Sequence, residues 1–318
     1  MIANPFLSIT IPTYNRSDFL DYCLEIHIPL VRKFNIQIFI SDNASTDSTK
    51  QVVEKWQQKY SLLYYYKNET NLGELNFEIA LKYPNTKFVW LLGDTAIFPA
   101  KSLIEIIKQL NLDYDMIIVN SNARVTNVSE MIIRDKNALL KNLGWHMTQI
   151  ASLIYNKKII EQALFDRYYD TNFIQTGIIF ETLAKQKNIF VLWLQECYTH
   201  EIQLPGIRKT SWRPYTFDIW IVRWSNFILS LPPQYTLENK LFAIQQHNNK
   251  TKLFKLKNLL TLRSDGYYNY KIFSTYKSIF SIALKNYSIF VLFIISILPS
   301  FPLNIMINII KKLKKYDT

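Results

Sequence analysis

Four short apolar runs recur at nearly even intervals in the first third of the chain. They end at residues 11, 40, 66 and 92, so the intervals are 29, 26 and 26 residues. Each run is mostly β-branched or aromatic, which is typical of a strand buried on both faces. The runs are Phe6–Ile11, Ile36–Ile40, Leu62–Tyr66 and Phe88–Leu92. A strand followed by a helix at this spacing predicts βαβ units and a parallel sheet.

The stretches between the runs carry helix-start signals. Ser17 is a candidate N-cap for the first helix, and Thr46-Asp47 is the cap signal of the second. The predicted helices are Asp18–Phe34, Ser48–Tyr60 and Gly73–Tyr83, and a fifth strand is predicted at Met116–Val119.

Composition excludes several classes of protein. The 318 residues allow one large domain or two modest ones. The only cysteines, Cys23 and Cys197, exclude a disulfide scaffold and a cysteine zinc site. With 6 glycines and no G-x-G-x-x-G, a glycine-rich phosphate loop is not expected. The first residues lack the basic segment and long apolar run of a signal peptide, so we expect a cytoplasmic protein.

The formal net charge of +12 allows three kinds of anionic partner: nucleic acid, a membrane surface or a phosphate-bearing substrate. A bias toward Lys, Asn, Ile and Tyr explains much of this charge without any partner. Because the aromatic residues lie in apolar runs rather than on a polar platform, we do not expect nucleic acid to be the partner.

Polar residues follow three of the four runs. They are Pro12-Thr13-Tyr14-Asn15-Arg16, the segment 41–47, and Gly93-Asp94-Thr95. Ligands of parallel sheets bind at the carboxyl ends of the strands. Tyr14 could pack on a base, Asp42 could accept from a base N–H, and Arg16 could meet a phosphate. Each acid alone is more often a turn or capping residue, and the agreement of three strand ends favours a ligand site.

Three segments together resemble family 2 glycosyltransferases with the GT-A fold. They are SITIPTYNR at 8–16, ISDNASTDST at 40–49 and WLLGDTAIF at 90–98, and the Asn71-Leu72-Gly73 turn is similar too. The resemblance implies an α/β GT-A nucleotide-diphospho-sugar transferase fold. Its features are a central, mostly parallel sheet and a helical C-terminal extension.

The resemblance also implies a donor site. The residues that would hold the nucleoside are Pro12, Thr13, Tyr14, Arg16 and Asp42. Asp94 would serve the ribose and a divalent metal, Mg²⁺ or Mn²⁺, on the diphosphate. This chain departs from the family pattern, because Thr95 and Ala96 follow Asp94 where further acids are usual. Either Asp94 holds the metal with water and diphosphate oxygens, or cationic side chains take the role of the metal.

A weaker resemblance places the residues that would bind the acceptor in the second half of the sequence. Residues 166–184 are similar to abequosyltransferase-like members of the family, in which a carboxylate accepts the proton of the acceptor hydroxyl. The candidates for this base are Asp166, Asp170 and Glu181, and we select Asp170, for which N-capping is the alternative role. Arg208 and Lys209 could screen the leaving diphosphate. His200 is expected in the core or at the surface rather than as a ligand.

The C-terminal region indicates a membrane surface. Residues 287–310 contain no charge, and Lys311, Lys312, Lys314 and Lys315 follow. Pro299 and Pro302 interrupt the run, which favours a segment lying in the cytoplasmic leaflet over a span. The alternative is a buried helical hairpin.

These observations predict three regions and one leading function. A GT-A domain covers 1–215, with a nucleotide-binding half at 1–110 and an acceptor half at 111–215. A helical extension covers 216–285 and a membrane-associating tail covers 286–318.

We expect an inverting glycosyltransferase at the inner face of the cell membrane. Its donor would be a nucleotide sugar, with UDP-sugars favoured, and its acceptor a polyprenyl-linked or oligosaccharide glycan. The alternative is a non-catalytic nucleotide-sugar-binding subunit.

Overall fold

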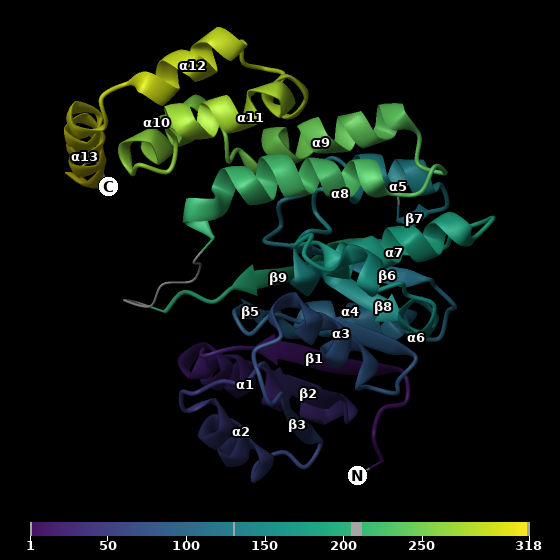
Figure 1. The fold of residues 1–318 in the computed structure, drawn as a ribbon. Coiled ribbons are helices and arrows are strands. Elements are labelled where there is room, and N and C mark those ends of the chain that lie inside the picture. The colour runs from purple at the N-terminus through teal and green to yellow at the C-terminus, as the bar shows by residue number, and fades with distance from the viewer. Residues whose placement is uncertain (1, 130, 205–211, 317–318) are drawn as a thin grey trace. The chain divides into compact units, whose positions relative to one another are not determined.

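A computed structural model of the protein describes residues 2–129, 131–204 and 212–316 (Figure 1). The chain divides into two compact units. The first comprises residues 1–207 with 231–235, and the second comprises 208–230 with 236–318. The domain boundaries expected at 215 and 285 stay predictions.

The first unit is built on one mixed sheet with the strand order β3-β2-β1-β4-β8-β6-β9-β5, and β7 pairs with β9. Strands β3, β2, β1 and β4 are parallel, whereas β8 joins β4 and β6 antiparallel. The strands are β1 Leu7–Thr13, β2 Gln37–Asp42, β3 Leu63–Lys67, β4 Phe88–Leu91, β5 Ala96–Ile97, β6 Met116–Ser121, β7 Ile132–Ile133, β8 Leu153–Asn156 and β9 Val191–Glu201.

Helices connect these strands. They are α1 Ser17–Val31, α2 Thr49–Gln57, α3 Asn76–Lys82, α4 Ala100–Gln109, α5 Lys136–Leu143, α6 Lys157–Glu161 and α7 Ile174–Lys185. The five predicted strands and three predicted helices are therefore confirmed, with small shifts at their ends. Two cap details differ. The N-cap of α1 is Arg16, and Ser17 is already the first helical residue. The N-cap of α2 is Ser48, although Asp47 Oδ1 accepts from the Thr49 N–H at 3.0 Å.

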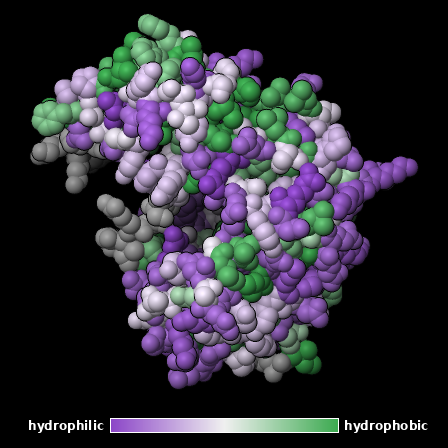
Figure 2. Space-filling view, viewed as in Figure 1, coloured by the Kyte–Doolittle hydropathy of each residue, from purple (hydrophilic) through white to green (hydrophobic). Residues whose placement is uncertain are grey.

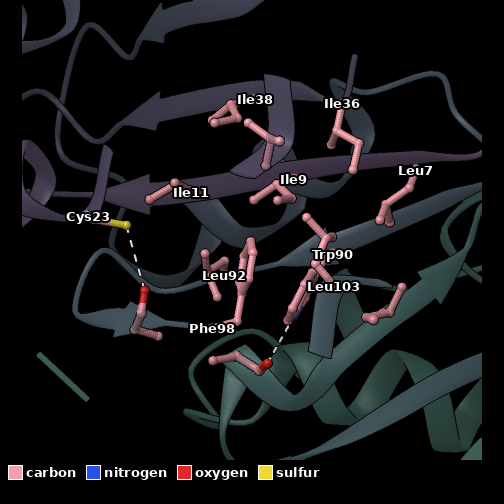
Figure 3. Close-up of a cluster of buried hydrophobic side chains, with 14 of the residues drawn as sticks. Leu7, Ile9, Ile11, Cys23, Ile36, Ile38, Trp90, Leu92, Phe98 and Leu103 are labelled. Atoms are coloured by element: carbon pink, nitrogen blue, oxygen red, sulfur yellow. Dashed lines mark hydrogen bonds between the residues drawn. The ribbon is translucent and has the colours of Figure 1, made fainter. Parts of the chain in front are cut away.

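The core of this unit lies against β1, whose apolar side chains are fully buried (Figure 3). Ile9 and Ile11 lie near Trp90 and Leu92 of the neighbouring strand region. The indole Nε1 of Trp90 donates to the Ala151 carbonyl at 3.0 Å, so even the polar atom of this large side chain has a partner. This packing fixes the strand ends from which the polar residues project.

The second unit is helical, as the sequence predicts for 216–285. It contains a π-helix at Asp218–Arg223 and the helices α8 Trp224–Ser230, α9 Leu237–Thr251, α10 Leu256–Ser264, α11 Tyr270–Ala283, α12 Ile289–Ile297 and α13 Ser300–Tyr316. Aromatic rings form its core: Phe217 stacks on Tyr268 at 4.7 Å between ring centroids, and Phe280 lies beside both.

Candidate active site

A cavity of about 320 Å³ opens at the carboxyl ends of β1 and β4 in the first unit. Five of the predicted site residues line it: Pro12, Thr13, Tyr14, Arg16 and Asp94. The remaining lining residues are Asn43, Gly73, Asn76, Phe77, Gly93, Thr95, Ala96, Ser121, Gln149, Ile150, Ala151, His200 and Glu201. Asp42 and Asp170 are not part of the lining, and Arg208 and Lys209 lie outside the described residues.

Asp94 is the most constrained group in this cavity. Its side chain is buried, and Thr13 Oγ1 donates to its Oδ2 at 2.9 Å. Arg16 Nη1 donates to Oδ1 at 3.2 Å and forms an ion pair with it, with about a third of the Arg16 side chain exposed. Burial raises the pKa of the Asp94 carboxyl, while the Arg16 charge and the Thr13 hydroxyl act in the opposite direction. The ion pair thus holds a guanidinium at the cavity wall.

Asp42 is fully buried and does not line the cavity. Tyr65 Oη donates to its Oδ2 at 2.6 Å, and the Ser45 backbone N–H donates to its Oδ1 at 2.8 Å. Burial and the Asp42 carboxylate together raise the pKa of Tyr65. In this structure Asp42 therefore fixes the loop that follows β2.

A network of buried asparagines forms another part of the cavity lining, and no sequence motif predicted it. Asn43 Nδ2 donates to the Gly73 carbonyl at 3.1 Å, and Asn43 Oδ1 accepts from the Leu72 N–H at 2.8 Å. Asn76 of α3 bonds both the hydroxyl and the carbonyl of Ser41. Gly73 has φ of +58°, a conformation that favours glycine. The Asn71-Leu72-Gly73 turn is thereby attached to the end of β2.

His200 and Glu201 reach the cavity from far along the chain. β9 pairs antiparallel with β5, so that Glu201 lies opposite Ala96 and His200 opposite Ile97. This pairing carries both side chains to the segment that follows Asp94. His200 was expected in the core or at the surface; it is exposed, which agrees with that expectation, and it also lines the cavity. Nothing local in the sequence marks these residues, because a two-residue strand creates the contact.

The three acids considered as the base are outside the cavity lining. Asp170 is exposed, with φ of +61°, and the N-cap of α7 is Phe173 rather than Asp170. Glu181 is buried and accepts from Tyr168 Oη at 2.8 Å, so it holds the loop to α7. That loop also bonds to the α3 region, where the Asn172 N–H donates to Glu74 Oε2 at 3.0 Å.

The residues present do not fit a metal centre built from several acids. Within the described ranges no group of three or more His, Cys, Asp or Glu side chains could hold an ion. Both oxygens of Asp94 already accept hydrogen bonds, and Thr95 and Ala96 offer no carboxylate. The Arg16 guanidinium is instead the cation in contact with Asp94.

Comparison with known proteins gives a consistent picture. The family model described as glycosyl transferase family 2 matches residues 8–174. The abequosyltransferase RfbV of Salmonella typhimurium is 30% identical over 165 residues, which cover 51% of this chain and 47% of that enzyme. The chain therefore matches about half of that relative's length. A Campylobacter jejuni protein named GalNAc(5)-diNAcBac-PP-undecaprenol beta-1,3-glucosyltransferase is 23% identical, covering 98% of this chain and 97% of that protein.

Solved structures share the fold. S. aureus TarS 1–349 in complex with UDP-GlcNAc has a TM-score of 0.54 at 16% identity, covering 84% of this chain and 83% of that one. The mannosyltransferase PcManGT from Pyrobaculum calidifontis, in complex with GDP-Man and Mn²⁺, has a TM-score of 0.55 at 15% identity, covering 90% and 81%. These likenesses confirm the predicted GT-A type of α/β fold.

Proposed function

This chain belongs to glycosyl transferase family 2, and we propose that it moves a sugar from a nucleotide-sugar donor to a hydroxyl of a glycan acceptor. The observation that carries the proposal is the convergence of Tyr14, Arg16 and Asp94 on one cavity at the ends of β1 and β4. The exposed Tyr14 ring offers a surface for a base. UDP-sugars are the donor class that we test first.

The proposed chemistry is an inverting transfer. The acceptor oxygen forms a bond to the anomeric carbon while the bond from that carbon to the diphosphate breaks. The electron pair leaves with the nucleoside diphosphate, and a carboxylate takes the hydroxyl proton. Stabilising the departing charge is the main task of the site. Arg16 is the described cation on the cavity lining that suits this task, since a guanidinium binds phosphate through several N–H donors.

We further propose that this stabilisation does not need a divalent metal. The support is the engagement of both Asp94 oxygens by Thr13 and Arg16. Turnover should then persist within about twofold in EDTA, whereas Arg16→Gln should lower kcat/KM by about 10–100-fold, the range for a lost charge-assisted hydrogen bond. Arg134→Gln, an exposed arginine outside the cavity lining, is the matched control. Metal-dependent turnover by the wild type would contradict this part.

The identity of the base is a separate proposal. Asp170 keeps the role assigned from the family resemblance, while Glu201 is a carboxylate on the cavity lining itself. We therefore compare Asp170→Asn with Glu201→Gln. The variant that loses about 10²–10⁴-fold in kcat with little change in donor KM identifies the base.

For the acceptor we propose a lipid-linked or cell-surface glycan, with the protein on the cytoplasmic face of the membrane. The name of the C. jejuni relative specifies an undecaprenol-linked acceptor for that protein. In this chain the support is the uncharged segment 287–310 followed by four lysines. A lipid-linked acceptor would hold the reaction close to a bilayer.

One specific observation favours a second candidate, a non-catalytic nucleotide-sugar-binding subunit: Thr95 and Ala96 stand where acids are usual in the family. The deciding experiment measures nucleoside diphosphate release from a panel of nucleotide sugars, with and without Mn²⁺. Release by the wild type and its loss in Arg16→Gln support the transferase. Binding of UDP in calorimetry without any release from the whole panel supports the second candidate and overturns the first.

A further inference from the structure

The last two helices of the second unit present apolar side chains to the outside. The most exposed are Phe290 of α12, at 67%, and Phe301 of α13, at 76%. The other exposed members are Ile289, Val291, Ile294, Ile297, Ile305, Met306 and Ile309. Figure 2 shows apolar side chains gathered over the part of the surface where Figure 1 draws α12. We call this set of nine residues the apolar face.

The inner side of α12 is fixed to the unit, and Leu303 of α13 is buried too. Leu292 and Ile295 are buried, and Tyr268 Oη donates to the Leu292 carbonyl at 2.9 Å. Arg263 Nε donates to the Leu298 carbonyl at 2.7 Å, directly after α12 ends. The apolar face is therefore the outer side of anchored helices. A side chain at each of these positions must find a partner outside this unit or remain in water.

The spacing along each helix gives a continuous stripe. Phe290, Ile294 and Ile297 share one side of α12, and Phe301, Ile305 and Ile309 share one side of α13. Among the described residues no single helix is long and apolar enough to cross a bilayer, and Ile289–Ile297 with Ser300–Ile307 passes that test only as a pair bent by 92°. Because the inner side of α12 packs against the unit, only its outer stripe is available for contact with lipid.

Charge decides between two occupants of the apolar face. Residues 266–316 contain seven lysines and no Asp or Glu. A second copy of this chain carries the same positive charge, which disfavours its approach. An anionic lipid surface attracts them, by about 1 kcal/mol for each lysine near the surface. The lysines are Lys271, Lys277, Lys285, Lys311, Lys312, Lys314 and Lys315.

A polar pocket lies next to the start of α12. It has a volume of about 200 Å³ and is formed by α9, the segment 254–255 and the turn 283–287. Lys255 and Lys285 line it, no carboxylate does, and neither lysine forms an ion pair with a residue that the structure describes. Asn286 Nδ2 donates to Asn249 Oδ1 at 2.8 Å, so the amides at its rim are ordered. Two cations with amide donors suit a phosphate group.

We propose that the apolar face lies in the headgroup region of an anionic phospholipid leaflet and that the pocket of Lys255 and Lys285 receives a lipid phosphate. The pocket ends at Tyr287, and α12 with its exposed Ile289 and Phe290 begins two residues later. A phosphate held there would place its acyl chains along α12. This inference rests on the membrane location proposed above and adds the surface and the headgroup chemistry.

The test is co-sedimentation of the full chain with vesicles of phosphatidylcholine alone or of phosphatidylcholine with phosphatidylglycerol. We expect binding to the anionic vesicles that weakens as salt rises. Phe290→Ser with Phe301→Ser should weaken it at least about tenfold, since each large apolar side chain contributes that order on burial. Leu237→Ser, an exposed leucine of the same unit outside the apolar face, should bind as the wild type does.

A second pair of variants tests the role of the pocket lysines in lipid binding. Lys255→Gln with Lys285→Gln should lower binding to anionic vesicles about thirtyfold, more than Lys101→Gln with Lys187→Gln, which removes the same charge from the first unit. Three results would overturn the proposal. The first is equal binding of the wild type to neutral and anionic vesicles. The others are no effect of the phenylalanine or the Lys255/Lys285 double variant, and a wild-type dimer that the phenylalanine variant dissociates. Diphosphate release to a water-soluble oligosaccharide acceptor, measured without vesicles, is expected to survive in the phenylalanine variant. Its absence in every protein would therefore count against the transferase and not against the lipid face.

Discussion

Asp94 is a buried acid whose charge is balanced by the protein itself. A carboxylate removed from water is costly unless donors and an opposite charge surround it. Thr13 and Arg16 provide both, and they belong to the segment at the end of β1, whereas Asp94 follows β4. The same ion pair therefore holds Arg16 at the cavity lining and links two strand ends.

Thr13→Val tests this arrangement with little change of shape. Loss of the hydroxyl raises the pKa of Asp94 further, because one interaction that favours the ionised form is gone. Asp94 must be ionised to hold Arg16. We therefore expect donor affinity to fall about tenfold and the acidic limb of its pH profile to move to higher pH. Thr10→Val on the same strand, whose buried Oγ1 has no hydrogen-bond partner among the described residues, is the control and should leave the profile in place. An unchanged pH profile in Thr13→Val would contradict the role of Asp94.

Gly177 is a position at which adding a single Cβ atom is expected to change the stability of the fold. A Cβ added there would lie 2.4 Å from the Tyr168 ring, which is fully buried and held by Glu181. Gly177→Ala should lower the free energy of unfolding by about 1–3 kcal/mol, as expected for overpacking, despite the better helix propensity of alanine. Lys185→Ala on the same helix should stay within about 0.5 kcal/mol in the same urea titration. A stabilised Gly177→Ala protein would show that Tyr168 moves freely.

At the scale of elements, the regular spacing of apolar runs was sufficient to predict the first four parallel strands, because a buried strand needs little beyond its own residues. The residues after β1 and β4 could be assigned to one cavity for the same reason. The contribution of β9 could not be predicted, since His200 and Glu201 arrive through pairing with β5, which has two residues. The asparagine network could not be predicted, because Asn43 and Asn68 follow strands, Asn76 begins α3, and nothing local indicates that their side chains meet.

Two buried histidines tie the elements together and make stability depend on pH. Burial lowers the pKa of His27 in α1 to about 3, and burial with the nearby Arg124 lowers that of His146 to about 3. Their unfolded pKa is about 6.5, so the unfolded chain binds more protons below that pH. Stability is complete above pH 6.5 and falls as the pH drops toward 3.

Each histidine should contribute up to about 1.4 kcal/mol per pH unit to this loss. Urea titrations between pH 6.5 and 5 measure the slope above the range in which most carboxylates titrate. His27→Gln and His146→Gln should each make the slope shallower by about that amount, whatever their absolute stability. Slopes identical to the wild type would mean that these side chains are protonated in the folded protein.

At the scale of the whole molecule, the chain has two compact units with separate cores. The first contains the cavity, and the second contains the aromatic cluster around Phe217 and the apolar face. A ligand of the cavity should therefore stabilise the first unit selectively. At 100 times its Kd, UDP should add about 2.7 kcal/mol to the unfolding free energy of that unit.

Calorimetric unfolding tests this division. We expect two transitions, of which UDP raises the midpoint of one, while Trp224→Ala lowers the midpoint of the other by removing a buried side chain of the second unit. A single transition that both changes shift together would contradict independent units.

The most direct test of the central claim is a calorimetric titration of UDP and GDP into the wild type, Arg16→Gln and Arg134→Gln in EDTA. The account predicts binding of a nucleoside diphosphate by the wild type and by Arg134→Gln, with at least about tenfold weaker binding by Arg16→Gln. Absence of binding to either diphosphate, or equal binding by all three proteins, would contradict a donor site at the ends of β1 and β4.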